Sequence, residues 1–182
     1  MVVVNKAIPK RIHIVGSVGS GKTTLAREIS SKLGIPYYEL DNVVWIRDES
    51  GDIRRTDQER ETCLNSIIQS ESWITEGVHT ADWASPCFHR ADLIVFLDTK
   101  YSIRVYRIGK RFFKQKLRIE ESNYKPTREI FIKMFKWNRD FEKKGKVNLF
   151  NKYGIHKDKM VIINKAKLAE KYVNNMRSRT IQ

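Results

Sequence analysis

Short apolar runs alternate with amphipathic segments along most of the chain, a pattern typical of βαβ proteins. Five apolar runs predict buried strands, at 11–15, 35–40, 72–75, 93–97 and 160–163. Helical spacing of apolar residues predicts helices at 21–33, 57–69, 101–118, 126–144 and 165–176. Segments 46–56 and 145–159 show neither period, which predicts an exposed excursion and a connection. Short apolar strands separated by helices favour a parallel sheet covered on both faces, and hence an α/β fold.

The composition is that of a folded protein and changes this picture little. A length of 182 residues fits one domain spanning 1–182. No apolar run approaches the roughly 20 residues that a membrane helix needs, and the first residues lack the features of a signal peptide. Cys63 and Cys87 form no CxxC pair, so we expect two buried thiols in a reducing, cytoplasmic environment and no membrane partner.

The charge is distributed unevenly along the chain. Residues 1–100 carry 12 basic and 14 acidic side chains, whereas residues 101–182 carry 23 and 7. The excess positive charge therefore belongs to the second part alone. This asymmetry predicts an anionic partner there, either a phosphorylated small molecule or a nucleic-acid backbone.

The segment between the first predicted strand and helix matches GxxxxGK[ST] at every fixed position. With the residue that follows, it comprises Gly16, Ser17, Val18, Gly19, Ser20, Gly21, Lys22, Thr23 and Thr24. Its glycines allow a tight turn whose N–H groups point at a phosphate, next to a helix N-terminus. Lys22 is expected to span the β- and γ-phosphates, Thr23 to bind Mg2+ and Thr24 to touch the α-phosphate. The segment predicts binding of a nucleoside triphosphate with Mg2+, with ATP preferred over GTP. The alternative is that a Gly/Ser-rich loop matches the motif by chance.

Acidic residues follow three predicted strands. Glu76 ends the third strand and is expected to reach Mg2+ beside the loop threonine, with Gly77 allowing close approach of a ligand. For Asp98, after the fourth strand, capping of the next helix is the preferred interpretation. Asp41, after the second strand, leaves two interpretations open. It orients or deprotonates an acceptor hydroxyl, or holds Mg2+ through water; otherwise it caps a short helix through Val43.

Arginines form two further groups of candidates. Arg54 and Arg55, in the polar excursion, fit a bidentate grip on an acceptor's phosphate or carboxylate, or a solvated turn. The helix at 101–118 carries a basic stripe of Arg104, Arg107, Arg111, Lys114 and Arg118. Like charges at this spacing cost stability, so an anion is expected to offset them, either a transferring phosphate or a nucleic-acid backbone. The residues expected to face the core are Tyr101, Val105, Ile108 and Phe112 here, and Ile130, Met134, Trp137 and Phe141 in the next helix.

Together these segments resemble the adenylate-kinase-like P-loop small-molecule kinases, and in particular the bacterial "DNA topology modulation protein" (FlaR-like) group. The resemblance covers most of residues 11–165 and is carried by segments 16–23, 40–45, 73–79, 91–98 and 104–111. It implies a three-layer P-loop NTPase fold with a five-stranded parallel sheet of order 2-3-1-4-5. It also implies a helical lid at about 104–125 that carries Arg107 and Arg111.

On the acceptor side the resemblance implies Asp41, Arg54 and Arg55. Such proteins usually read Asp-Gly-Asn-Tyr where this chain has Glu76-Gly77-Val78-His79. Glu76 would therefore bind the metal through a side chain that is one methylene longer than the usual aspartate. His79 takes the place of an aromatic residue beside the acceptor.

Two functions of different class follow from these residues. The leading interpretation is an ATP- and Mg2+-dependent phosphotransferase, a monomer or homodimer, acting on a small acceptor such as a nucleoside or nucleotide. Its expected catalytic residues are Lys22, Asp41, Arg107 and Arg111. The alternative is a nucleotide-dependent DNA-binding or topology-modulating regulatory protein that uses the basic part 101–182. A GTPase switch is disfavoured, because no Asn-Lys-x-Asp segment follows a late strand.

Overall fold

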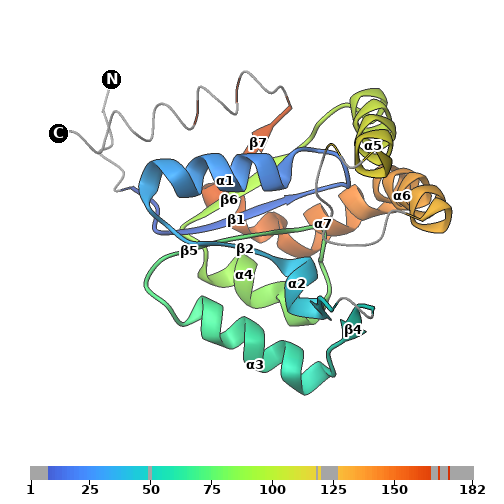
Figure 1. Cartoon of the computed structure of the whole chain (residues 1–182). Coiled ribbons are helices and arrows are strands. Elements are labelled where there is room, and N and C mark those ends of the chain that lie inside the picture. Colours follow the sequence, from blue (N-terminus) through green and yellow to red (C-terminus); the bar gives the residue numbers. More distant parts are fainter. Residues whose placement is uncertain are drawn as a thin grey trace.

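The computed structural model describes residues 8–48, 51–117, 119, 127–164, 168 and 172. A five-stranded sheet lies at its centre (Figure 1). Its strands are β1 (Arg11–Gly16), β2 (Tyr37–Glu39), β5 (Trp73–Gly77), β6 (Leu93–Leu97) and β7 (Met160–Ile163). They lie in the order β2-β5-β1-β6-β7, and all neighbours are parallel. Counting only these strands along the chain, the order is 2-3-1-4-5, which confirms the prediction.

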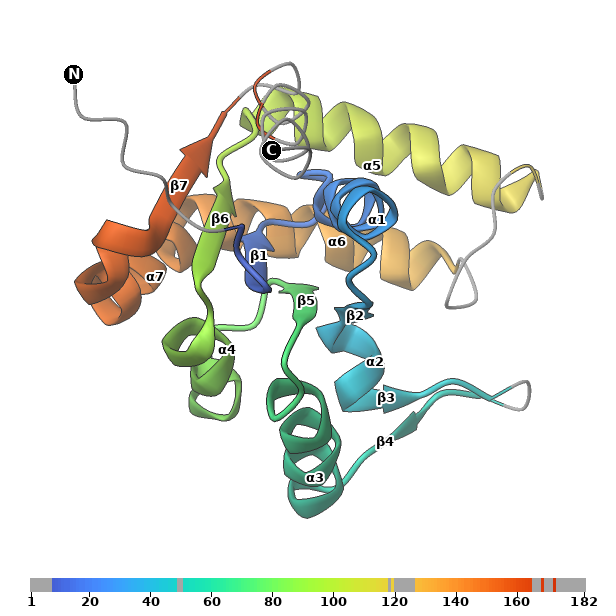
Figure 2. The same cartoon turned by 90° about the vertical axis from the view of Figure 1, so that its left-hand side faces the viewer.

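Helices cover both faces of the sheet (Figure 1). One face packs against α1 (Lys22–Leu33). The opposite face packs against α2 (Leu40–Val44), α3 (Asp57–Ile68), α4 (Ser85–Arg90) and α7 (Lys146–Tyr153). Two further helices, α5 (Tyr101–Lys116) and α6 (Arg128–Asp140), run side by side (Figure 2) and stack Phe112 on Phe131. The molecule is therefore a three-layer α/β structure with a helical pair attached.

Strand β6 shows why the strands read as unbroken apolar runs. Successive side chains of a strand point to opposite faces. The side chains of Leu93, Val95 and Leu97 pack in the core beneath α1, and those of Ile94 and Phe96 pack in the core on the other face. Because both faces are covered, every position of the strand is apolar.

The ends of two helices follow from local chemistry. Thr56 Oγ1 accepts a hydrogen bond from the Glu59 N–H at 3.2 Å, and the Glu59 carboxylate accepts one from the Thr56 N–H at 2.8 Å. This capping box starts α3. Gly34 ends α1 at a φ of 67°, as the sequence predicts.

Four segments differ from the sequence prediction, and all contain elements too short to show a period. Leu40 starts α2 where the second strand was expected to end. The expected excursion holds an antiparallel hairpin of β3 (Trp45–Ile46) and β4 (Ile53–Arg54). A 3-10 turn, η1 (Asp82–Ala84), and α4 were not predicted at all. The expected connection at 145–159 is helical: after the π-helical turn η2 (Phe141–Gly145) come α7 and the 3-10 turn η3 (Gly154–Lys159).

The buried face of α5 also differs from the prediction. Arg104 and Ile108 are buried, whereas Tyr101 is 41% exposed. The basic stripe therefore begins on the inner face of the helix, and Tyr101 was wrongly assigned to the core. In the next helical stretch Met134 is buried as predicted, but Trp137 is 53% exposed.

Some predictions fall on residues outside the described part of the chain. These are Arg118, the segment 120–126 of the expected lid, and most of the closing helix at 165–176. Among the described residues, no helix combines the length and the apolar character that crossing a membrane requires.

His13 occupies a buried position in the middle of the sheet. The ring is 0% exposed, its Nδ1 lies 2.9 Å from Thr75 Oγ1, and it meets the Phe88 ring edge-on with centroids 4.4 Å apart. Burial disfavours the charged imidazolium and lowers the pKa of His13 to about 3. The folded protein therefore keeps this histidine neutral.

We predict that His13 makes folding weaken in mild acid. Below a pH of about 6.5 the unfolded chain protonates this histidine and the folded chain does not, so the free energy of unfolding falls as the pH falls. Between pH 7 and pH 5 the loss should be about 2 kcal/mol. Urea unfolding of the wild type and of His13→Gln at both pH values measures it. Equal losses in the two proteins would contradict the prediction.

Candidate functional site

The loop between β1 and α1 has the geometry of an anion cradle. Gly19 and Gly21 have φ angles of 74° and 101°, which lie in the left-handed region. A Cβ on Gly19 would also lie 3.0 Å from the carbonyl oxygen of Arg104. Gly21 is the N-cap of α1, makes no side-chain cap bond, and is followed by no acidic residue in the first turn. The first N–H groups of α1 are thus left for an anion.

Lys22 and Thr23 lie in the first turn of α1, beside this loop. Lys22 Nζ donates to the Ser17 carbonyl oxygen at 3.1 Å. Thr23 Oγ1 donates to Glu76 Oε1 at 2.5 Å, and Glu76 is only 5% exposed. Hydroxyl and carboxylate oxygens are ligands that Mg2+ prefers, so this pair fits the predicted metal. Val18 is half-buried and Thr24 is exposed at the edge of the loop.

Glu39 is a second carboxylate at this place that the sequence analysis missed. It pairs with Glu76 across β2 and β5, and paired residues of neighbouring strands lie on one face. Burial, and then the negative charge of Glu76, raise the pKa of Glu39, although Arg27 lies 3.9 Å away. A divalent cation beside Thr23 would offset the repulsion between the two carboxylates. The sequence carried one clue, an acid at the end of the second strand.

Asp41 and His79 form a hydrogen-bonded pair at the ends of β2 and β5. His79 Nε2 lies 2.9 Å from Asp41 Oδ1. Desolvation by itself would raise the pKa of Asp41, but the hydrogen bond and charge of His79, and the charge of Lys22, outweigh it and lower this pKa. Gly77 permits the approach, because a Cβ there would lie 3.0 Å from Leu40 and 3.3 Å from His79.

The capping role considered for Asp41 is not found. The N-cap of α2 is Glu39, which makes no side-chain cap bond, and Asp41 lies inside the first turn. Capping is also not the role of Asp98, because Lys100 is the N-cap of α5. Asp98 instead pairs with Lys146 at 2.6 Å. The acid that ends β6 is therefore tied to α7.

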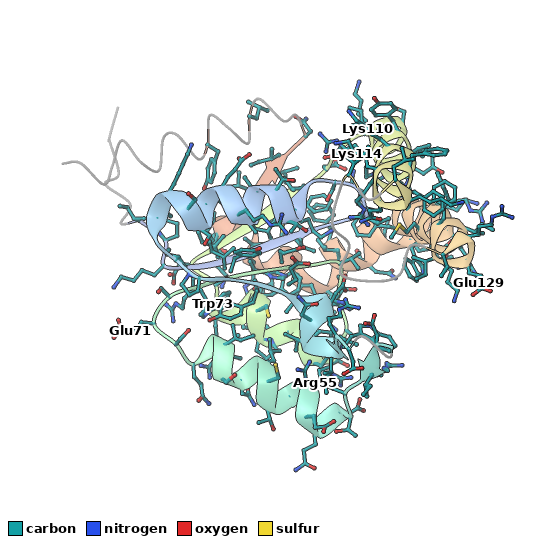
Figure 3. All side chains as sticks on the ribbon, viewed as in Figure 1. Arg55, Glu71, Trp73, Lys110, Lys114 and Glu129 are labelled. Carbon is teal, nitrogen blue, oxygen red and sulfur yellow. The ribbon has the colours of Figure 1, made fainter. Side chains whose placement is uncertain are left out.

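Arg54 and Arg55 make contacts within the hairpin region and with the end of α2. Arg55 Nη1 donates to the carbonyl oxygens of Asn42 at 2.6 Å and Val43 at 3.3 Å, which caps the end of α2. Figure 3 shows Arg55 beside α2 and the hairpin. Arg54 is exposed and lies 5.9 Å from the centre of the Trp45 ring. We therefore leave both out of the acceptor site proposed below.

Arg107 is the basic residue of α5 that reaches the phosphate loop. Its Nη1 donates to the Ser20 carbonyl oxygen at 3.0 Å. Arg111, one turn further, has Nη2 3.7 Å from Met134 Sδ of α6. Arg104 is buried and paired with Glu142, so its charge is already balanced. A carboxylate of the protein itself, on η2, thus offsets part of the charge of the stripe.

A groove on the surface of the described residues lies away from the phosphate loop. A groove of about 610 Å3 follows the flank of α5 and is lined mostly by apolar side chains, among them Tyr106, Phe113 and Phe135. None of the predicted site residues lines it. The groove is thus separate from the chemistry of the loop.

Comparison with known proteins places this loop in a family. Residues 12–182 match the family described as "ATPase family associated with various cellular activities (AAA)". The chain belongs to this AAA ATPase family. The match includes the whole phosphate loop and nearly all of the sheet.

Two curated relatives match part of this AAA protein. The uncharacterized protein YqaC of Bacillus subtilis (strain 168) is 30% identical over 106 residues, 58% of either chain. A shikimate kinase of Marinomonas sp. (strain MWYL1) is 27% identical over 113 residues, 54% of this chain and 62% of the relative. The chain thus matches less than two thirds of the length of each.

A solved structure shares the whole fold. The shikimate kinase of Bacteroides thetaiotaomicron superposes with a TM-score of 0.54 at 18% identity, covering 96% of this chain and 99% of that one. At this identity the likeness concerns the fold alone. The predicted P-loop kinase fold is confirmed.

We predict that Glu76 supports metal-dependent nucleotide binding. Glu76→Gln removes a negative charge beside Thr23, so the Mg2+ concentration at half-maximal ATP binding should rise by at least about tenfold, the scale seen when residues around a metal are changed. Titration calorimetry with ATP at stepped Mg2+ concentrations measures it. Asp98→Asn is the matched control, because Asp98 follows β6, which β1 separates from β5, and pairs with Lys146. An unchanged Mg2+ midpoint in Glu76→Gln would refute the metal role.

Proposed function

We propose that this protein is an ATP- and Mg2+-dependent phosphotransferase acting on a small acceptor of the nucleoside or nucleotide class. One observation carries the proposal: the Asp41–His79 pair lies close enough to Lys22 for its charge to lower the pKa of Asp41. A carboxylate held ionised beside a phosphate cradle suits proton removal from an acceptor. The relative named a shikimate kinase supports a small hydroxylated acceptor.

On the donor side, the loop N–H groups and Lys22 hold the phosphates of ATP. Thr23 and Glu76 would hold Mg2+, which would supply positive charge beside the phosphates. Arg107 already lies at the loop, with its guanidinium on the Ser20 carbonyl. It can turn from that carbonyl to the γ-phosphate, where positive charge stabilises the transition state.

On the acceptor side, Asp41 accepts a hydrogen bond from the attacking hydroxyl. The hydroxyl oxygen forms a bond to the γ-phosphorus while the bond to the β,γ-bridging oxygen breaks and ADP leaves. The hydroxyl proton passes to Asp41. His79, held by its bond to Asp41, keeps that carboxylate in place.

The rest of the acceptor site follows from the contacts of His79. The His79 ring packs on Trp83, with centroids 5.0 Å apart, and the Arg60 guanidinium lies 5.0 Å from the centre of the Trp83 ring. Arg60 is 8% exposed; its Nη1 donates to Asp57 Oδ1 at 2.8 Å, and its Nε is buried without a hydrogen-bond partner among the described residues. A guanidinium in this state suits a phosphate or carboxylate of the acceptor. Sequence reasoning missed it, because Arg60 lies within an ordinary amphipathic helix.

The test is transfer of label from γ-32P-ATP. The wild type is offered nucleosides, nucleotides, sugars, polyols and hydroxy acids one at a time, and Lys22→Ala is the control for the phosphate loop. We expect label in one class of acceptor with the wild type only. Release of inorganic phosphate alone, with no labelled acceptor, would show that the protein hydrolyses ATP and would contradict the proposed transfer.

We predict that Asp41 acts in the chemical step. With the acceptor found above, Asp41→Asn should lower kcat by about 100-fold or more, the scale of general base catalysis. The Kd of ATP should change less than twofold. In His79→Gln the pKa of Asp41 should rise, because its largest lowering influence is lost. The acid limb of the pH–rate profile should then move to higher pH. A kcat within threefold of the wild type in Asp41→Asn would contradict the role.

The second candidate is a nucleotide-dependent DNA-binding or topology-modulating protein. It is favoured by the charge of α5, which has no acidic residue from Tyr101 to Lys116, and by Lys110 and Lys114, which Figure 3 shows on this helix. Several phosphate contacts would make the affinity for duplex DNA fall steeply with salt. A steep slope that Lys110→Gln makes shallower supports this function. If Lys110→Gln leaves the salt dependence of the DNA affinity unchanged, the DNA-binding function is contradicted.

A further inference from the structure

Asn138 joins α6 to the phosphate loop. Its side chain is 0% exposed, and Oδ1 accepts a hydrogen bond from Ser17 Oγ at 3.1 Å. Ser17 is also 0% exposed and stands directly after Gly16 in the loop. The bond thus connects two buried side chains that are 121 residues apart in the sequence.

An asparagine is an unfavourable choice at this position unless it does something else. Asparagine is a weak helix former, and a buried amide loses its hydrogen bonds to water. Asn138 Nδ2 has no hydrogen-bond partner among the described residues. Alanine or leucine would suit both the helix and the packing better. What asparagine adds here is the bond to Ser17.

A second contact acts on the same loop from the same helical stretch. Glu142 lies one turn after Asn138, in the π-helical turn η2, and pairs with the buried Arg104 of α5. The backbone of Arg104 lies against Gly19, closely enough that a Cβ there would be 3.0 Å from the Arg104 carbonyl oxygen. π-Turns inside helices are frequent at functional sites. The stretch from Asn138 to Glu142 therefore supports both the first and the middle part of the loop.

We propose that Asn138 is a positioning residue for nucleotide binding, which holds Ser17 so that the loop keeps its anion-binding shape. An anion cradle binds tightly when its N–H groups are fixed before the ligand arrives. A phosphate loop binds its anion through backbone N–H groups, so the Ser17 hydroxyl can bond to Asn138 without a loss to that binding. The inference rests on the ATP-binding part of the proposed function and does not depend on the acceptor.

The test compares four variants with the wild type. Asn138→Ala and Ser17→Ala each remove one partner, and the double variant removes both. Leu149→Ala is the control, because Leu149 of α7 is 0% exposed in the core and its side chain makes no hydrogen bond to the loop. Two quantities are measured: hydrogen exchange of the amides from Gly16 to Lys22 without nucleotide, and the Kd of ATP–Mg2+ by calorimetry.

We expect each single loop variant to raise the exchange of these amides and the Kd of ATP by roughly tenfold. The double variant should lose no more than either single variant, because the two residues act as one unit. Leu149→Ala should lower the melting temperature but keep the Kd within twofold. Wild-type exchange and Kd in both single variants, or additive losses in the double variant, would overturn the proposal. If the wild type bound no ATP while loop exchange still rose in both variants, ATP binding would be refuted and the positioning role upheld.

Discussion

The parallel pairing of β2, β5 and β1 is the constraint on which the site depends. Parallel strands end at the same edge of a sheet, so the residues that follow them meet there. The phosphate loop follows β1, Glu76 and His79 lie at the end of β5, and Asp41 follows β2. Antiparallel pairing would send one of these groups to the opposite edge. The site is thus a consequence of strand direction before any side chain makes a contact.

Electrostatics explain how α5 can turn Arg104 and Arg107 toward the phosphate loop. Ion pairs of an arginine stripe that faces water would add little to the stability of the protein. Like charges at helical spacing also repel one another. Here Glu142 forms an ion pair with the buried Arg104, and the guanidinium of Arg107 donates a hydrogen bond to the Ser20 carbonyl oxygen of the loop. The helix therefore brings positive charge to the phosphate loop without leaving all of it unbalanced. The aromatic side chains that would otherwise fill the inner face, such as Phe113 at 63% exposed, lie outside.

The proposed acceptor side is formed by contacts between side chains. It consists of the Asp41–His79 bond, the packing of His79 on Trp83, and the buried guanidinium of Arg60. These groups come from two short helical elements, the segment after β5, and α3. The phosphate loop, by contrast, is fixed by backbone angles and by packing against α5. In the proposed phosphotransferase, this division leaves the choice of acceptor to side chains while the backbone of the loop fixes the donor.

The sequence by itself determined the five strands of the central sheet and the phosphate loop, because these depend on local periodicity and on glycines at fixed spacing. The order of the strands came from the resemblance to P-loop kinases. The sequence did not reveal α4 or α7, whose few turns carry no readable period. Only the tertiary structure decided that Arg104 is buried, that Glu39 lies beside Glu76, and that Arg55 caps α2. It alone joined Asp41 to His79, 38 residues away, and Ser17 to Asn138, 121 residues away. Such pairs depend on how distant elements pack, and no local pattern contains that information.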